Sequence, residues 1–121
     1  MEEEKKNHNE TREAAEKAAS SVEEREVLVI KLGDPFLFDG KEVKELNMEG
    51  LLELTAADLC AIDRQMISMG YTGGQLELTR QYAMLVAAKV KGKPWEYCNG
   101  MRARDSIRLK NAVTAFFYAM G

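Results

Sequence analysis

The stretch that decides the fold runs from Val27 to Leu59 and reads VLVIKLGDPFLFDGKEVKELNMEGLLELTAADL. Its central dipeptide, Asp39-Gly40, predicts a β-hairpin with a two-residue loop. Both central positions of such a loop need a positive φ, which Asp and Gly tolerate better than most residues. The register then follows as two facing pairs across the hairpin, Phe38 with Lys41 and Phe36 with Val43.

Two irregularities are expected in this hairpin. Leu46 and Met48 have the opposite parity to Val43, which implies either a bulge near Lys44-Glu45 or a strand that turns its other face inward. Gly33-Asp34-Pro35 interrupts the first strand, and proline suits only an edge or a bulge. We therefore expect the first strand to be broken or bent.

Downstream of the hairpin, Thr55 and Asp58 predict the start of a helix. The Thr55 hydroxyl can accept a free backbone N–H of the first turn, and Asp58 can return the bond as in a capping box. Apolar residues then recur with helical spacing over Ala56 to Met69, and Gly70 can end the helix in the left-handed conformation.

Three further helical segments are predicted. Residues Gln75 to Lys91 are apolar over a broad arc, so this helix should be central. Pro94 can open a short helical turn from Trp95 to Asn99, closed by Gly100. Residues Met101 to Met120 carry the cleanest helical periodicity of the chain. The predicted fold class is thus mainly α with a small N-terminal β-hairpin (α+β), with a three- to four-helix domain packed behind the hairpin.

Asp105 lies on the apolar stripe of the last predicted helix, one turn before Leu109. It is either an N-cap that divides this segment or a buried carboxylate with an arginine partner such as Arg102 or Arg104. We expect the cap.

The composition fits one small domain preceded by a tail. Residues 1–26 contain no aromatic and almost no large aliphatic side chain, so we expect a disordered acidic tail or a frayed helix over Glu10 to Lys17, with an amphipathic partner helix as the alternative. Residues 27–121 should form a single hairpin-plus-helices domain. No apolar run is long enough to span a bilayer, and we expect an intracellular, cytoplasmic protein in which Cys60 and Cys98 are reduced and buried.

Charge is divided unevenly along the chain. Residues 1–60 contain 8 Lys+Arg and 16 Asp+Glu, a net of −8, whereas residues 61–121 contain 9 and 4, a net of +5. The two halves could attract each other. A solvated surface explains this pattern better than a nucleic-acid footprint, which usually raises the pI of the domain well above 5.3.

Most catalytic constellations can be excluded for the predicted domain. The one histidine, His8, lies in the tail, so a nucleophilic triad has no imidazole base there. Two isolated cysteines and a tail histidine cannot form a tetrahedral zinc set. Asp58 and Asp63 are five residues apart on one helix, so they point in different directions. We therefore expect no enzymatic activity, no cofactor and no metal.

Several apolar residues are candidates for contact with a protein partner. Trp95 and Tyr97 stand beside a Gly-Lys-Pro loop and could anchor a partner or equally cover the core. Methionines suit surfaces that accept irregular apolar partners, although scattered methionines are more often core residues. The candidate partner-binding residues are Trp95, Tyr97, Met101, Phe117 and Met120.

The order and spacing of these motifs resemble the small tail assembly chaperones of long-tailed bacteriophages and prophages. The resemblance rests on a hydrophobic strand, the run from Phe38 to Met48, the segment Leu54-Thr55-x-x-Asp58-Leu59 and a closing segment from Asp105 to Phe117. It covers about Val27 to Met120, and the acidic tail is not part of it. Each motif is short and would occur in unrelated domains.

The resemblance implies a non-enzymatic role. Such chaperones bind the long, helical, apolar tape measure protein while tail tube subunits polymerise around it. They carry no cofactor and self-associate in some cases. Many are made in a short form and in a longer form that arises by ribosomal frameshifting, and this chain would be the short form. The alternatives are a helical nucleic-acid-binding module that uses Arg102, Arg104, Arg108 and Lys110, and a structural virion subunit.

Overall fold

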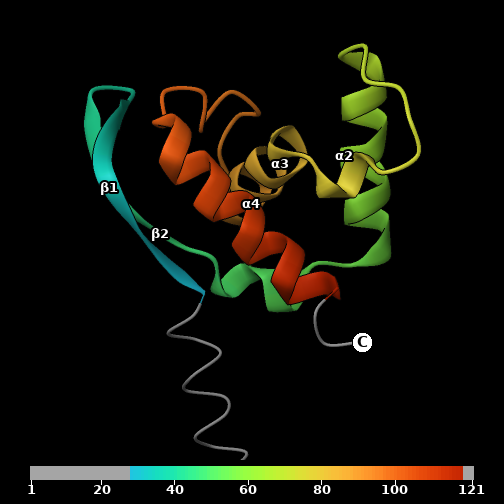
Figure 1. Cartoon of the computed structure of the whole chain (residues 1–121), viewed down its shortest axis with the longest axis horizontal. Coiled ribbons are helices and arrows are strands. Elements are labelled where there is room, and N and C mark those ends of the chain that lie inside the picture. Colours follow the sequence, from blue (N-terminus) through green and yellow to red (C-terminus); the bar gives the residue numbers. More distant parts are fainter. Residues whose placement is uncertain (1–27, 119–121) are drawn as a thin grey trace, which may run out of the picture.

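A computed structural model describes residues 28–118 as an α+β fold, in which a two-stranded hairpin packs beside three α-helices (Figure 1). The predicted fold class is confirmed. The prediction for the acidic tail falls on residues outside the described range. In chain order the elements are β1 (Val29–Phe38), β2 (Lys41–Asn47), the 3-10 helix η1 (Glu49–Glu53), α2 (Ala56–Ser68), the 3-10 helix η2 (Leu76–Leu78), α3 (Arg80–Lys91) and α4 (Ala103–Tyr118).

The hairpin turns at Asp39-Gly40, as the sequence predicts. The φ angles of the two residues are 52° and 77°, the positive pair that a two-residue loop requires. The predicted register is confirmed: Phe38 pairs with Lys41, and Phe36 pairs with Val43.

The predicted irregularity lies in β1 rather than in β2. Lys31 pairs with Glu45 and Phe36 pairs with Val43, so residues 32–35 of β1 lie opposite Lys44 alone. This bulge contains Gly33-Asp34-Pro35, the predicted interruption. Proline is tolerated there because residues in a bulge do not pair with the other strand and so need no backbone N–H. It also explains the change of parity, since Val43 and the buried Leu46 both face the helices.

The helix α2 begins as predicted with a capping box. Thr55 Oγ1 accepts a 3.2 Å hydrogen bond from the Asp58 N–H, and Asp58 Oδ2 accepts one of 2.9 Å from the Thr55 N–H. The helix ends at Ser68, and Gly70 follows with φ 95°. Both ends thus follow from local residue chemistry.

The helix α3 is central, as its broad apolar arc predicts. It contacts α2 and α4, and its buried residues include Tyr82, Val86 and Ala87. It begins at Arg80 rather than near Gln75, because Thr79 Oγ1 accepts a 3.1 Å hydrogen bond from the Tyr82 N–H and caps the helix. The residues expected in its first turn form η2 instead.

The segment between α3 and α4 forms consecutive hydrogen-bonded turns where the short helical turn from Trp95 to Asn99 is predicted. The Tyr97 N–H donates to the Pro94 carbonyl at 2.9 Å, and the Asn99 N–H donates to the Glu96 carbonyl at 3.0 Å. Tyr97 makes edge-to-face contacts with Phe36 and Phe38, with ring centroids 5.8 and 4.8 Å away. These contacts hold the loop against the hairpin.

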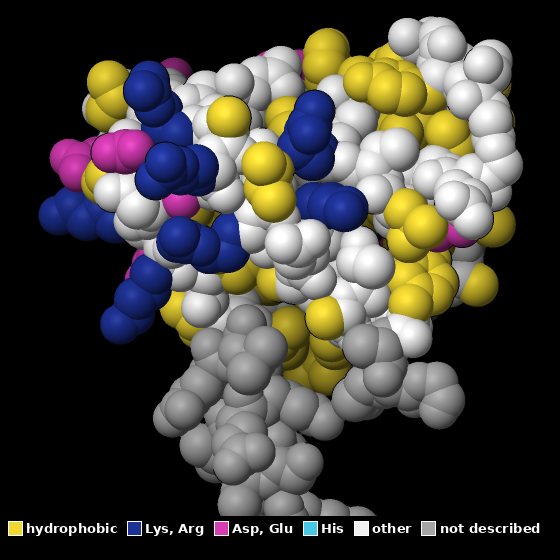
Figure 2. Space-filling model, viewed as in Figure 1, with side chains coloured by type: hydrophobic (Ala, Val, Ile, Leu, Met, Phe, Trp, Pro, Cys, Tyr) yellow, Lys and Arg dark blue, Asp and Glu magenta, His cyan; other side chains and the backbone are white. Residues whose placement is uncertain are grey.

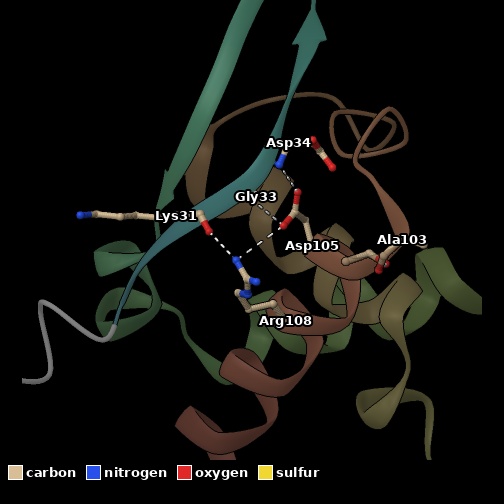
Figure 3. Close-up of polar contacts among 7 residues, drawn as sticks. Lys31, Gly33, Asp34, Ala103, Asp105 and Arg108 are labelled. Atoms are coloured by element: carbon tan, nitrogen blue, oxygen red, sulfur yellow. Dashed lines mark hydrogen bonds and ion pairs between the residues drawn. The ribbon is translucent and has the colours of Figure 1, made fainter.

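The expectation that Asp105 caps a helix is wrong. The helix α4 begins at Ala103, so Asp105 lies inside its first turn, and its side chain is buried. The carboxylate accepts hydrogen bonds from the backbone N–H groups of Gly33 (2.8 Å) and Asp34 (3.1 Å) in the β1 bulge (Figure 3). The carboxylate binds these two donors of a distant strand and does not cap its own helix, because a buried carboxylate needs hydrogen-bond partners.

Asp105 is instead the buried carboxylate with an arginine partner, the other alternative that the sequence allows. That partner is Arg108, in place of Arg102 or Arg104. Its guanidinium lies 3.7 Å from the carboxylate and donates a 2.9 Å hydrogen bond to the Lys31 carbonyl (Figure 3). Arg108 is one helical turn beyond Asp105, so both side chains reach the same part of β1. Together they join α4 to the edge of the hairpin.

The core lies between the hairpin and the helices. Among its fully buried side chains, those from β2, the residue before η1, α2 and α4 include Leu46, Met48, Met66, Leu109 and Val113. In the described part of the chain no helix has the length and apolar character needed to cross a membrane.

The expectation of two buried thiols is correct for Cys98 and wrong for Cys60. Both are free, but Cys60 is exposed on α2. Burial raises the pKa of the Cys98 thiol to about 12, because a thiolate is poorly solvated in the core.

Candidate partner-binding surface

Two grooves flank the central helix α3. The first, which we call the α2–α3 groove, has a volume of about 210 Å³. Most of its lining is apolar, and Ile62 and Leu85 are core residues that form part of its lining. The residues that line it are Ala61, Ile62, Gln65, Leu85, Ala88, Lys89, Lys93 and Trp95.

Trp95 lines this groove with 47% of its surface exposed. The turns after Pro94 hold the loop, so the indole is presented from a fixed segment. A large aromatic side chain that stays exposed beside an apolar groove has the character of an interface anchor. The α2–α3 groove can therefore take up apolar side chains of a partner.

Lys89, which lines the α2–α3 groove, forms an ion pair. Lys89 Nζ lies 3.5 Å from Asp58 Oδ1 and joins α3 to the first turn of α2. The pKa of Asp58 is lowered, first by the hydrogen bonds with the backbone and hydroxyl of Thr55 and then by Lys89. This carboxylate is engaged in structure and is poorly suited to act as a general base.

The second groove, which we call the α3–α4 groove, is larger, with a volume of about 630 Å³. It combines four apolar side chains with two cations, and no Asp or Glu lines it among residues 28–118. Its lining residues are Tyr71, Leu78, Thr79, Arg80, Gln81, Met84, Ile107 and Lys110. Tyr71 and Ile107 are 39% and 45% exposed, so apolar surface is accessible there.

A wider group of basic side chains includes Lys110 of the α3–α4 groove. Figure 2 shows Lys and Arg side chains over α4 and the neighbouring hairpin, with few Asp or Glu among them. The helix α4 supplies Arg104, Arg108 and Lys110, and Arg102 directly precedes it. This face can attract an acidic partner.

The predicted partner-binding residues do not form one patch. Trp95 lines the α2–α3 groove, whereas Tyr97, two residues later, is only 5% exposed and packs on the hairpin. Met101 and Phe117 are partly buried against the core. Met120 lies outside the described residues. Of the four predicted residues within the described range, only Trp95 is both exposed and beside a groove.

Sequence reasoning missed the residues of the α3–α4 groove. Ile107 offered a signal, because it lies two residues before Leu109 and so falls on the opposite face of the helix from the apolar stripe. An isoleucine on that polar face is exposed unless something covers it. Tyr71 and Arg80 gave no such signal, since the groove exists only where η2, α3 and α4 meet.

Within residues 28–118 no group of three or more His, Cys, Asp and Glu side chains could hold a metal ion. Burial raises the pKa of Tyr82 to about 12, with a smaller contribution from the negative charge of Asp63, so this phenol stays protonated near neutral pH. The expected lack of enzymatic activity stays a prediction.

No family model matches the chain, and neither a curated protein nor a solved structure matches it. The class of protein therefore rests on the fold, the two grooves and the family resemblance of the sequence.

Proposed function

We propose that this chain is a non-enzymatic tail assembly chaperone of a bacteriophage or prophage, which acts in the cytoplasm of the bacterial host. It binds the tape measure protein while the tail tube assembles around it. A frameshifted longer form of the chain and a second copy are further candidate partners. The motif order from the hairpin to the Asp105–Phe117 segment supports this class.

The exposed Trp95 beside the α2–α3 groove is the observation that carries the proposal. A tape measure helix without its tail tube presents apolar side chains at i, i+3, i+4 and i+7, and a chaperone must cover them. The groove takes one or two such side chains, and the indole packs over the helix beside them. This arrangement requires no catalytic group.

The fluorescence of Trp95 offers a direct test, because it is the only tryptophan of the chain. Purified chain is titrated with apolar helical fragments of the tape measure protein encoded beside it. We expect a blue shift of the emission as the indole leaves water. We expect Trp95→Ala to weaken binding, measured by calorimetry, by about 30-fold, the effect of a residue worth about 2 kcal/mol at an interface.

A matched control is Leu52→Ala. Leu52 is 54% exposed on η1 and lines neither groove, so its loss should leave the affinity unchanged. No binding of any fragment, or equal losses for Trp95→Ala and Leu52→Ala, would contradict the proposal.

The basic face over α4 favours one second candidate, a nucleic-acid-binding module (Figure 2). Binding to phosphates weakens steeply as the salt concentration rises, because counterions are released. DNA binding with that salt dependence, lost in an Arg102→Glu/Arg104→Glu variant, would favour this candidate. A complex with tape measure fragments that survives salt favours the chaperone. Mass spectrometry of purified virions separates both from a structural subunit, since a chaperone is absent from the finished particle.

A further inference from the structure

The α3–α4 groove has the chemistry to bind an acidic segment with small apolar side chains. Arg80 and Lys110 supply two cations, and no carboxylate among the described residues lines the groove to neutralise them. Gln81 also lines it, and its Nε2 is buried without a hydrogen-bond partner within residues 28–118. A ligand that brings oxygen acceptors would satisfy these donors, because unpaired buried donors are costly.

The groove also leaves apolar surface in water. Tyr71 and Ile107 are substantially exposed, and Met84 of α3 also lines the groove. Small apolar side chains of the ligand could cover this surface without needing a deep pocket. The ligand that fits is thus acidic and alanine-rich rather than purely hydrophobic.

The chain itself contains such a segment before the hairpin. Residues 1–26 hold 9 Glu and 5 Lys+Arg, a net of −4. Within it, glutamates alternate with the small apolar residues Ala14, Ala15, Ala18, Ala19 and Val22. Helical spacing would put these small residues along one side, with Glu10 and Glu23 at its edges.

The length of the segment allows it to reach the groove. A chain of this length spans up to about 80 Å when extended, at about 3.3 Å per residue, which exceeds the size of a small domain. Because the segment is tethered to β1, its local concentration is of millimolar order, so weak contacts suffice to hold it.

We propose that residues 1–26 bind the α3–α4 groove of the same chain, with glutamates on Arg80 and Lys110 and the alanines on Tyr71, Met84 and Ile107. The segment then covers apolar surface that is open in the domain. The proposal concerns a different groove from the one assigned to the tape measure protein.

Paramagnetic relaxation in the full-length chain tests this contact without any partner. A nitroxide is attached at Asn9→Cys in a Cys60→Ser background, while the buried Cys98 stays unlabelled. We expect the amides of residues 79–84 and 107–110 to lose most of their peak intensity, and those of α2 to keep theirs. Reversing the groove charges with Arg80→Glu/Lys110→Glu should restore the intensities.

Two further variants make the result decisive. Arg102→Glu/Arg104→Glu changes the charge by the same amount outside the groove, so the broadening should persist. Glu10→Gln/Glu23→Gln leaves the described domain intact and should abolish the broadening, even where the groove variant fails to fold. Broadening that is absent, uniform or centred on residues 102–104 overturns the proposal. So does broadening transferred between labelled and unlabelled copies in a mixed sample, which would assign the contact to a second chain.

Discussion

The carboxylate of Asp105 accepts a hydrogen bond of 2.8 Å from the backbone N–H of Gly33, 72 residues earlier in the chain. A Cβ at Gly33 would lie 3.4 Å from that oxygen, so the strand and the helix are in close contact at this point. The bond ties the first turn of α4 to the β1 bulge. The hairpin therefore depends on a helix that is formed much later in the sequence.

Removing this carboxylate should destabilise the fold. We expect Asp105→Ala to lower the free energy of unfolding by about 2–4 kcal/mol, because two backbone N–H groups and Arg108 lose their acceptor. Asp105→Asn keeps one acceptor oxygen and should cost less. Urea denaturation followed by circular dichroism measures both. Arg104→Ala, at an exposed position of the same turn, should change the free energy by no more than about 0.5 kcal/mol. A loss for Asp105→Ala as small as that control would contradict this account.

The close approach of η1 to α3 at Gly50 gives a second prediction. A Cβ there would lie 2.8 Å from Val90 Cγ1, and the β-branched valine has little freedom to move. We expect Gly50→Ala to lower the free energy of unfolding by about 1–3 kcal/mol. Gly74→Ala is the matched control, since a Cβ at Gly74 meets nothing within 4 Å. It should be neutral or slightly stabilising, and equal melting temperatures of the two variants would refute the steric explanation.

The capping box makes part of the free energy of unfolding depend on pH. Because the folded state lowers the pKa of Asp58 below its ordinary value of 3.8, its contribution is present at neutral pH and is lost as the pH falls through the folded-state pKa. Asp58→Asn should therefore show a weaker loss of stability between neutral pH and about pH 3. Thr55→Ala, which removes the hydrogen bond to the Asp58 N–H, should cost about 1 kcal/mol and also reduce the acid dependence. An unchanged acid dependence in both variants would argue against the box.

The two thiols should react at very different rates. At neutral pH an aromatic disulfide reagent should label Cys60 rapidly, whereas Cys98 should react only as fast as the domain opens, since its thiol is buried and its pKa is about 12. Cys60→Ser and Cys98→Ser assign the two phases. Rapid labelling of the Cys60→Ser variant would show that Cys98 is more accessible than the fold implies.

Local chemistry made much of this fold predictable. The Asp39-Gly40 turn sets the hairpin register, and Thr55 with Asp58 sets the start of α2, because each feature depends on neighbouring residues. The start of α3 after its cap Thr79 could be predicted on the same grounds, although the predicted helix began further upstream, near Gln75.

Contacts between distant segments could not be predicted in the same way. Asp105 has the residue type of a helix cap, and nothing near it in the sequence shows that Gly33 and Asp34 donate to it. Cys60 lies within an apolar-periodic helix yet faces solvent, because α2 has neighbours on one side only. The two grooves likewise appear only when separate elements meet, so Trp95 was a candidate before its surroundings were known.

The bulge opposite Lys44 fixes how the two strands may align. If a regular hairpin shifts its register by two residues, the same apolar face still points to the helices. In this hairpin four residues of β1 lie opposite one residue of β2, so such a shift would lose the match at the bulge. A hairpin exchanged between copies would have to seat its bulge on Asp105 of the other copy. The pairing therefore has a single alignment, and insertions should be tolerated at the Asp39-Gly40 tip sooner than within residues 32–35.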